Sequence, residues 1–161
     1  MFLSRLNDTK IGGSDQVASE LITSKADTMT SLFADIWRSF LNLPSWVQIW
    51  MFLVLGPVNM ATLAFLSQPS GMLVAALAVG GLAISLTALI ADRGFTKLVS
   101  AGHVVTWAPL VVILVFARPG ATATYDTFLT ILLAANIFSL IFDFNDLRLW
   151  YKGDRAVFTK T

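Results

Sequence analysis

The sequence predicts an all-α membrane protein with four transmembrane helices preceded by an amphipathic interfacial helix. The composition is 56% hydrophobic and only 13% charged, and the mean hydropathy is +0.73. Residues 39–91 contain no Asp, Glu, Lys or Arg at all. A water-soluble surface carries more charge than this. The four apolar segments that we expect to cross the membrane are residues 46–66, 72–91, 98–117 and 127–143.

The first two apolar segments are each long enough for a bilayer, since about 20 helical residues at about 1.5 Å each cross a core about 30 Å thick. Only the polar stretch SQPSG separates them, which predicts a helical hairpin. Pro57 lacks the N–H that would bond the carbonyl of Leu53, so we expect a kink that faces other helices. Asn59 and Thr62, three residues apart, would share one helix face.

The second segment contains two pairs of small residues at a spacing of four, Ala76 with Gly80 and Gly81 with Ser85. Such pairs let two helix backbones approach closely, which places this helix at a contact. Small residues are also common in membrane helices generally, and that explanation accounts equally well for either pair alone.

The fourth segment is short, because its charge-free residues 127–142 extend only about 24 Å at about 1.5 Å per residue. We therefore expect Asp143 at the edge of the hydrocarbon. The sequence divides into a partly helical cytoplasmic N-terminal region, an interfacial helix, the transmembrane domain and a cytoplasmic tail, at residues 1–27, 28–43, 44–144 and 145–161.

The residues before the first span show no apolar core of a signal peptide, so no cleaved signal is expected. Ser14 can cap a helix over residues 15–25. Further on, apolar residues recur at helical spacing opposite a polar face, at Met29, Leu32, Phe33, Ile36, Trp37, Phe40 and Leu41. An aromatic-rich apolar face suits the headgroup region of a membrane, and packing on a soluble partner is the alternative.

The basic residues predict the orientation. Of the eleven Lys and Arg residues, only Arg118 falls in the loops on one side, and the other ten gather at the termini and in the middle loop. By the positive-inside rule both termini are cytoplasmic. The tryptophans expected to anchor this side at the interface are Trp37, Trp46, Trp50 and Trp150.

Polar side chains form a stripe on the fourth segment, where the spacing places them on one helix face. At similar depths on other segments lie one asparagine and the one histidine of the chain. The predicted intramembrane cluster is Asn59, His103, Asn136, Ser139, Asp143 and Asp146. Ionisable residues inside a membrane indicate function, although snorkelling or a simple salt bridge would also explain His103 and Asp143.

His103 is also a candidate cofactor ligand. Its neighbours Ala101 and Gly102 are small and would admit a flat ring such as haem, chlorin or quinone. Ser139 or Asp143 could hold its other ring nitrogen, as ligation requires. The chain has no second histidine for a bis-histidine site, and the alternative is a hydrogen-bonded structural residue. A bound lipid or pigment is the expected kind of cofactor.

Other chemistry finds little support in the sequence. There is no cysteine, so disulfides and thiolate sites are excluded. No GxSxG, HExxH, Walker or dinucleotide-binding pattern is present, which argues against an enzyme. The net charge of +1 gives no reason to expect nucleic acid as a partner. The expected partners are membrane lipid and other membrane protein subunits.

Two stretches, LPSWVQIWMFLVLGPVNMA (residues 43–61) and FDFNDLRLWYKGDR (residues 142–155), resemble segments of small uncharacterised bacterial membrane proteins with four spans. The likeness covers residues 36–157. It implies a bacterial inner membrane and the same topology, and it transfers no known catalytic residue to this chain.

Three functional hypotheses follow. The leading one is a non-catalytic accessory or scaffold subunit that docks to a larger membrane complex through its small-residue faces and N-terminal region. The second is a small oligomeric transporter or channel built around Asn136, Ser139 and Asp143. The third is a pigment-binding or haem-binding subunit that uses His103.

The topology can be tested by labelling single cysteines with an impermeant maleimide in intact cells. Cysteines introduced at Ser70 and Ala121 should react from outside. Those at Ser24 and Thr159 should react only after the membrane is opened. A reversed pattern would contradict the predicted orientation.

Overall fold

The computed structural model describes residues 3–120 and 122–158, with side chains from residue 16 onward in those ranges. The described residues form helices and no strand, which confirms the predicted all-α fold. The chain divides into two compact units, Met1–Asp35 and Ile36–Thr161. The second unit, called here the four-helix unit, contains the four predicted spans.

The N-terminal part of the chain is a single helix, α1 (Leu3–Leu41). We predicted a partly helical region to residue 27 and a separate helix over residues 28–43, and the boundary between them is absent. The helix also passes through Ser14, so the predicted cap there is wrong. The chain has no proline before Pro44, and a glycine inside a helix costs only about 1 kcal/mol relative to alanine. Gly12 and Gly13 are therefore accommodated.

The last residues of α1 belong to the four-helix unit and pack on it. Phe40 is buried, with its ring centroid 5.1 Å from that of Phe52 and 5.9 Å from that of Phe95. The backbone N–H of Phe95 donates to Ser39 Oγ at 3.0 Å. This end of the predicted amphipathic helix is thus fixed by protein contacts, while Trp37 remains exposed.

Four helical stretches are long and apolar enough to cross a membrane, namely Ser45–Phe65, Gly71–Ala91, Val99–Phe116 and Ala123–Tyr151. The first three agree with the predicted spans within one or two residues. The fourth, α6, runs on past the predicted end at residue 143, so part of the predicted tail is helical. By these helices the chain is a multi-pass membrane protein.

The first span is irregular around its proline. It consists of α2 (Ser45–Ile49), a π-helical turn η1 (Trp50–Leu55), α3 (Gly56–Ala61) and a 3-10 turn η2 (Thr62–Phe65). Pro57 is the second residue of α3, which directly follows the π-helical turn, and the N–H of Gly56 bonds the carbonyl of Met51, five residues back. The predicted irregularity at Pro57 is therefore a change of helix type. Such π-helical turns occur often at functional sites.

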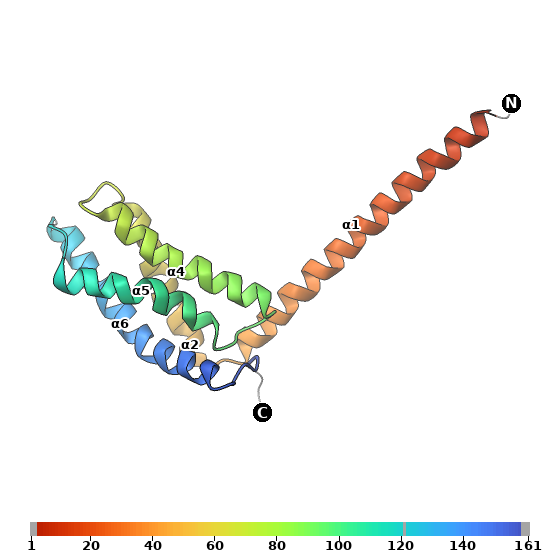
Figure 1. Cartoon of the computed structure of the whole chain (residues 1–161). Helices are drawn as coiled ribbons and strands as arrows, with labels where there is room; N and C mark the ends of the chain where they lie inside the picture. The colour runs from red at the N-terminus through yellow and green to blue at the C-terminus, as the bar shows by residue number, and fades with distance from the viewer. Residues whose placement is uncertain (1–2, 121, 159–161) are drawn as a thin grey trace. The chain divides into compact units, whose positions relative to one another are not determined.

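Helices α4 (Gly71–Ala91) and α5 (Val99–Phe116) lie side by side (Figure 1). A Cβ atom on Gly102 would lie only 2.5 Å from Ser85 Oγ and 2.9 Å from the carbonyl oxygen of Gly81. Ser85 Oγ donates to the carbonyl of Val99 at 2.7 Å. The predicted pair Gly81 and Ser85 thus lies at the α4–α5 contact.

The other small-residue pair lies elsewhere on α4. Ala76 is exposed and Gly80 is half-buried. A Cβ atom on Gly80 would have ordinary space, with its nearest neighbour, Thr106 Cγ2, at 3.9 Å. This pair therefore leaves an uncovered face on the four-helix unit.

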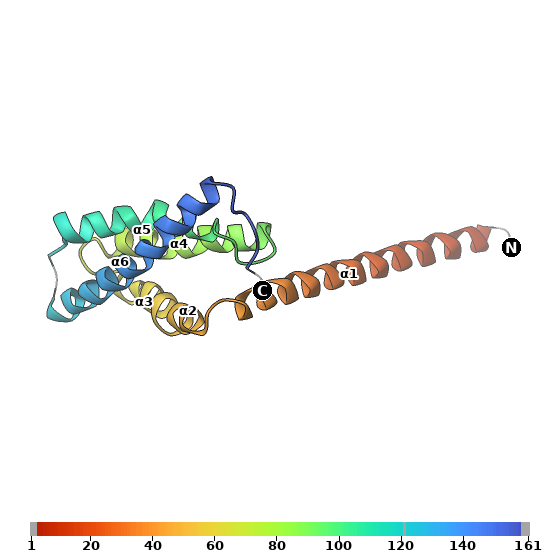
Figure 2. The ribbon, with the colours of Figure 1, turned by 90° about the horizontal axis from the view of Figure 1, so that it is seen from below.

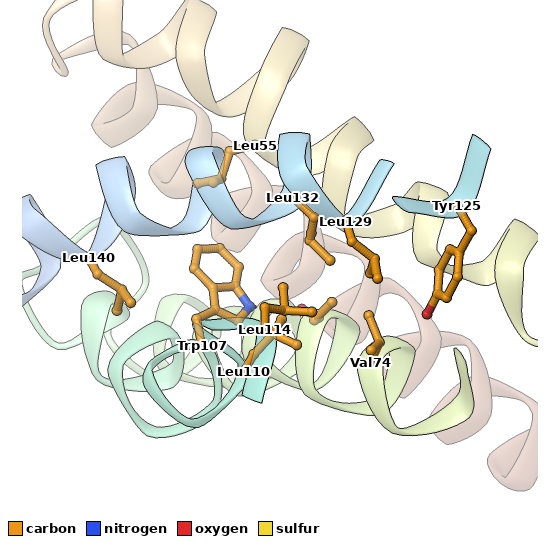
Figure 3. Close-up of a cluster of buried hydrophobic side chains, with 10 residues drawn as sticks. Leu55, Val74, Trp107, Leu110, Leu114, Tyr125, Leu129, Leu132 and Leu140 are labelled. Atoms are coloured by element: carbon orange, nitrogen blue, oxygen red, sulfur yellow. The ribbon is translucent and has the colours of Figure 1, made fainter. Parts of the chain in front are cut away.

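A core of large side chains joins the four spans. Figure 3 shows Trp107 and Leu110 of α5 below Leu55 of the first span and Leu132 of α6, and Val74 of α4 belongs to the same cluster. Most of these side chains are completely buried. The indole N–H of Trp107 donates to the carbonyl of Ala78 at 2.9 Å, which adds a polar contact between α4 and α5.

The segment after α6, up to Phe158, folds back toward the α4–α5 loop at one end of the four-helix unit (Figure 2). The N–H of Phe158 donates to the carbonyl of Phe95 at 2.9 Å, and Asn42 Nδ2 donates to the carbonyl of Phe158 at 3.2 Å. Lys97 Nζ lies 2.8 Å from Asp154 Oδ2, and this hydrogen bond lowers the pKa of Asp154. Residues after Tyr151 are thus part of the fold.

Candidate functional site

A cavity of about 270 Å³ lies between the first span, the start of α5, the second half of α6 and Phe158. Its aromatic wall consists of Trp46, Trp50, Phe95, Phe142 and Phe158. Its other polar residues, called here the polar lining, are Thr96, Ser100, His103, Ser139, Asp143 and Asp146. Two predicted interfacial anchors, Trp46 and Trp50, are therefore cavity residues. Trp150 packs elsewhere, under the guanidinium of Arg155.

The polar lining centres on a hydrogen-bonded histidine and aspartate. His103 Nδ1 lies 3.2 Å from Asp143 Oδ1, and Ser139 Oγ donates to Asp143 Oδ2 at 2.9 Å. All three residues are buried, at 7% to 9% exposure. Ser139 and Asp143 are one helical turn apart on α6 and face α5 together. The depth comparison made from the sequence predicted this proximity, and the structure brings the three side chains into contact.

Trp107 holds the ring of His103 from its face. The two ring centroids are 3.8 Å apart and the planes differ by 4°. Trp107 follows His103 by four residues, one helical turn, and this spacing is the signal in the sequence that indicates the contact. The imidazole is fixed at its face by Trp107 and at its edge by Asp143.

These contacts determine the tautomer of a neutral His103. An ionised carboxylate only accepts hydrogen bonds, so Nδ1 carries the proton that Asp143 accepts. Nε2 is left with its lone pair. In the part of the chain that the structure describes, no hydrogen bond engages Nε2.

The two asparagines of the predicted cluster form a separate pair. Asn59 Nδ2 donates to Asn136 Oδ1 at 3.0 Å and to the carbonyl of Leu55 at 2.9 Å. Both side chains are fully buried, and neither lines the cavity. Interhelical hydrogen bonds of this kind contribute about 0.6 kcal/mol on average in membrane proteins. This pair ties the first span to α6, and the predicted cluster divides into a structural part and a cavity part.

The site fits a metal-bearing pigment only in part. Asp143 holds Nδ1 in the way that ligating histidines are usually held. Gly102, expected to make room for a flat ring, instead faces Ser85 and Gly81 across the helix contact. The cavity is also below the range of about 300–1,000 Å³ that encloses drug-sized ligands, and a tetrapyrrole is larger still. No group of three metal-binding side chains occurs among the residues searched.

The geometry also bears on nucleophilic chemistry. An activated serine donates its proton to a histidine. Here the hydroxyl of Ser139 donates to Asp143, and His103 bonds the other oxygen of that carboxylate. The arrangement is thus suited to holding a ligand at Nε2 rather than to activating Ser139.

No family model matches the chain, and neither a curated protein nor a solved structure is significantly similar to it. The resemblance noted in residues 36–157 therefore stays a prediction. What can be concluded about the site comes from its own contacts.

Proposed function

We propose that this protein binds a small amphipathic molecule in the cavity beside His103. The observation that carries the proposal is the buried pair of His103 and Asp143 in the wall of a cavity that is otherwise mostly aromatic and aliphatic. An aromatic wall with a few fixed polar groups is the usual composition of a small-molecule site.

A purely structural role for the pair explains less. Burying ionisable groups in a membrane is costly, and a structural hydrogen bond between α5 and α6 could be made by uncharged residues, as Asn59 and Asn136 do elsewhere. A structural pair also needs no cavity beside it. The free Nε2 atom and the adjoining space both favour a ligand.

Passage of a solute through the four-helix unit is less well supported than binding. At the level of Leu110, Leu114 and Leu129 the interior is filled by side chains with at most 1% exposure. These three side chains belong to the buried core of Figure 3, and none of them lines the cavity. A cavity closed by such a core favours a site that holds its ligand.

We place the protein in a bacterial inner membrane, with both termini in the cytoplasm. The support is the distribution of Lys and Arg, ten of which belong to the termini and the middle loop. The cavity lies at the end of the unit that contains this loop and the C-terminal segment. In this orientation the ligand binds at the level of the inner leaflet.

Ligand binding can be measured by isothermal titration of the protein in nanodiscs, using 4-pentylbenzyl probes with amine, alcohol and carboxylate head groups. At least one probe should bind saturably, one per chain. Val99→Phe enlarges a side chain in the cavity wall and should weaken that binding about tenfold or more, a loss of about 1.4 kcal/mol. Val105→Phe, on the exposed face of the same helix, should leave it unchanged.

Two results would contradict the proposal. One is that no probe binds above the level of empty nanodiscs. The other is that Val99→Phe and Val105→Phe bind equally well while both retain the helical circular dichroism of the parent.

The uncovered face of α4 favours a second candidate function, an accessory subunit of a larger membrane complex. Ala76 and Gly80 lie in a shallow apolar groove that also includes Leu63, Leu66 and Met72. Small residues at such a face let a neighbouring transmembrane helix approach closely. This role is compatible with ligand binding, because the groove and the cavity share no residue.

The accessory role predicts a stoichiometric partner in native mass spectrometry after gentle extraction from the source membrane. Gly80→Leu should fill the groove and release the partner, since the space at Gly80 allows the larger side chain. Ala134→Leu, on an exposed part of α6, is the matched control and should retain it. A protein that runs alone, or only with copies of itself, removes this candidate.

A further inference from the structure

We infer that the ligand is a protonated lipophilic amine, an organic cation that donates hydrogen bonds and carries an apolar body. The inference rests on the proposed function, that the cavity binds a small amphipathic molecule. The reason is that most polar atoms of the lining have no proton left to donate to a ligand.

The three hydroxyl groups of the polar lining already donate their protons inside the protein. Thr96 Oγ1 donates to Asp92 Oδ2 at 2.6 Å, and Ser100 Oγ donates to the carbonyl of Lys97 at 2.6 Å. Ser139 Oγ donates to Asp143, as described above. A hydroxyl has one proton, so each of these groups has only lone pairs left for a ligand.

The ionisable groups of the lining are also acceptors. Where His103 is neutral and Asp143 is ionised, Nδ1 donates its proton to Asp143 and Nε2 keeps a lone pair. Asp143 and Asp146 are carboxylates, which accept only when ionised. In the aromatic wall, the indole N–H of Trp50 is buried without a partner among the described residues and so has no access to the cavity. Trp46 carries the one other side-chain N–H of the wall.

The charges of the polar lining also favour a ligand that is a cation. Two carboxylates line the cavity, and no Lys or Arg of the described chain does so. The nearby Lys97 is paired with Asp154 and lies over the ring of Phe158, 4.9 Å from its centroid, so the ring faces left for a ligand cation are those of the other aromatic residues. The aromatic wall adds to this preference, since the faces of Trp and Phe rings attract cations.

Other ligand classes match this lining less well. An anion would face two carboxylates, and a neutral acceptor such as a quinone carbonyl or an ester would find few donors. A neutral alcohol could donate one proton to Nε2 but would gain nothing from the charges. A protonated amine supplies both donors and charge, and a volume of about 270 Å³ suits one ring or a short chain.

The test compares four probes that share a 4-pentylphenyl body in phosphatidylcholine nanodiscs at neutral pH, with empty nanodiscs subtracted. They are 4-pentylbenzylamine, its N,N,N-trimethyl derivative, 4-pentylbenzyl alcohol and 4-pentylbenzoate. The primary amine should bind at least about tenfold more tightly than the alcohol, and the benzoate should not bind. The trimethyl derivative, which has the charge without the donors, should fall between amine and alcohol.

Two variants test whether the carboxylates cause the preference for the amine. Asp143→Asn and Asp146→Asn should each reduce the ratio of amine affinity to alcohol affinity at least about fivefold, and unchanged helical circular dichroism would show that the variants are folded. Asp146 is half-buried and outside the hydrogen bonds of His103, so its variant remains informative if Asp143→Asn does not fold. Asp27→Asn, on the exposed surface of α1, is the matched control.

The results separate the two proposals. If the alcohol or the benzoate binds as tightly as the amine, the inference is overturned while the cavity remains a binding site. If no probe binds, the inference and the proposed function both fail.

Discussion

The proposed ligand site depends on the hydrogen bond between His103 and Asp143, because this bond determines which nitrogen of a neutral His103 ring carries the proton. Once Nδ1 donates to Asp143, Nε2 is an acceptor, and the adjoining cavity has polar atoms that mostly accept. Ser139 and Trp107 hold the two partners of this bond in place. If the bond were absent, the imidazole could turn or exchange tautomers, and the cavity would lose its preference for a donor.

The close packing of α4 against α5 supports this hydrogen bond through Trp107. Gly81, Ser85 and Gly102 let α4 and α5 approach closely, and the approach brings the indole N–H of Trp107 to the carbonyl of Ala78. Trp107 in turn supports the ring of His103. In a membrane there is no hydrophobic force between helices comparable to that in water, so close packing and internal hydrogen bonds carry the association. The small residues of α4 thus act on the site through two intervening contacts.

Hydropathy and spacing were enough to predict the four spans, the contact at Gly81 and Ser85, and the proximity of His103 to Asp143, since these depend on periodicity and depth. The contacts of the segment after α6 could not be predicted. Phe158 enters the cavity wall because the chain folds back on Phe95, which no local pattern indicates. The continuity of α1 could not be predicted, because the cap at Ser14 and the apolar repeat from Met29 are separate local signals that do not show how the two segments join. Gly102 was assigned to ligand space because its neighbour across the helix contact was unknown.

The most direct test of the central claim is the protonation of the single histidine, measured by ¹⁵N NMR on protein labelled only at histidine in nanodiscs at neutral pH. One labelled residue makes the assignment unambiguous. We expect a protonated Nδ1 and an unprotonated Nε2, with this preference lost in Asp143→Asn. A proton on Nε2 in the parent protein, in either the other tautomer or the imidazolium form, would contradict it.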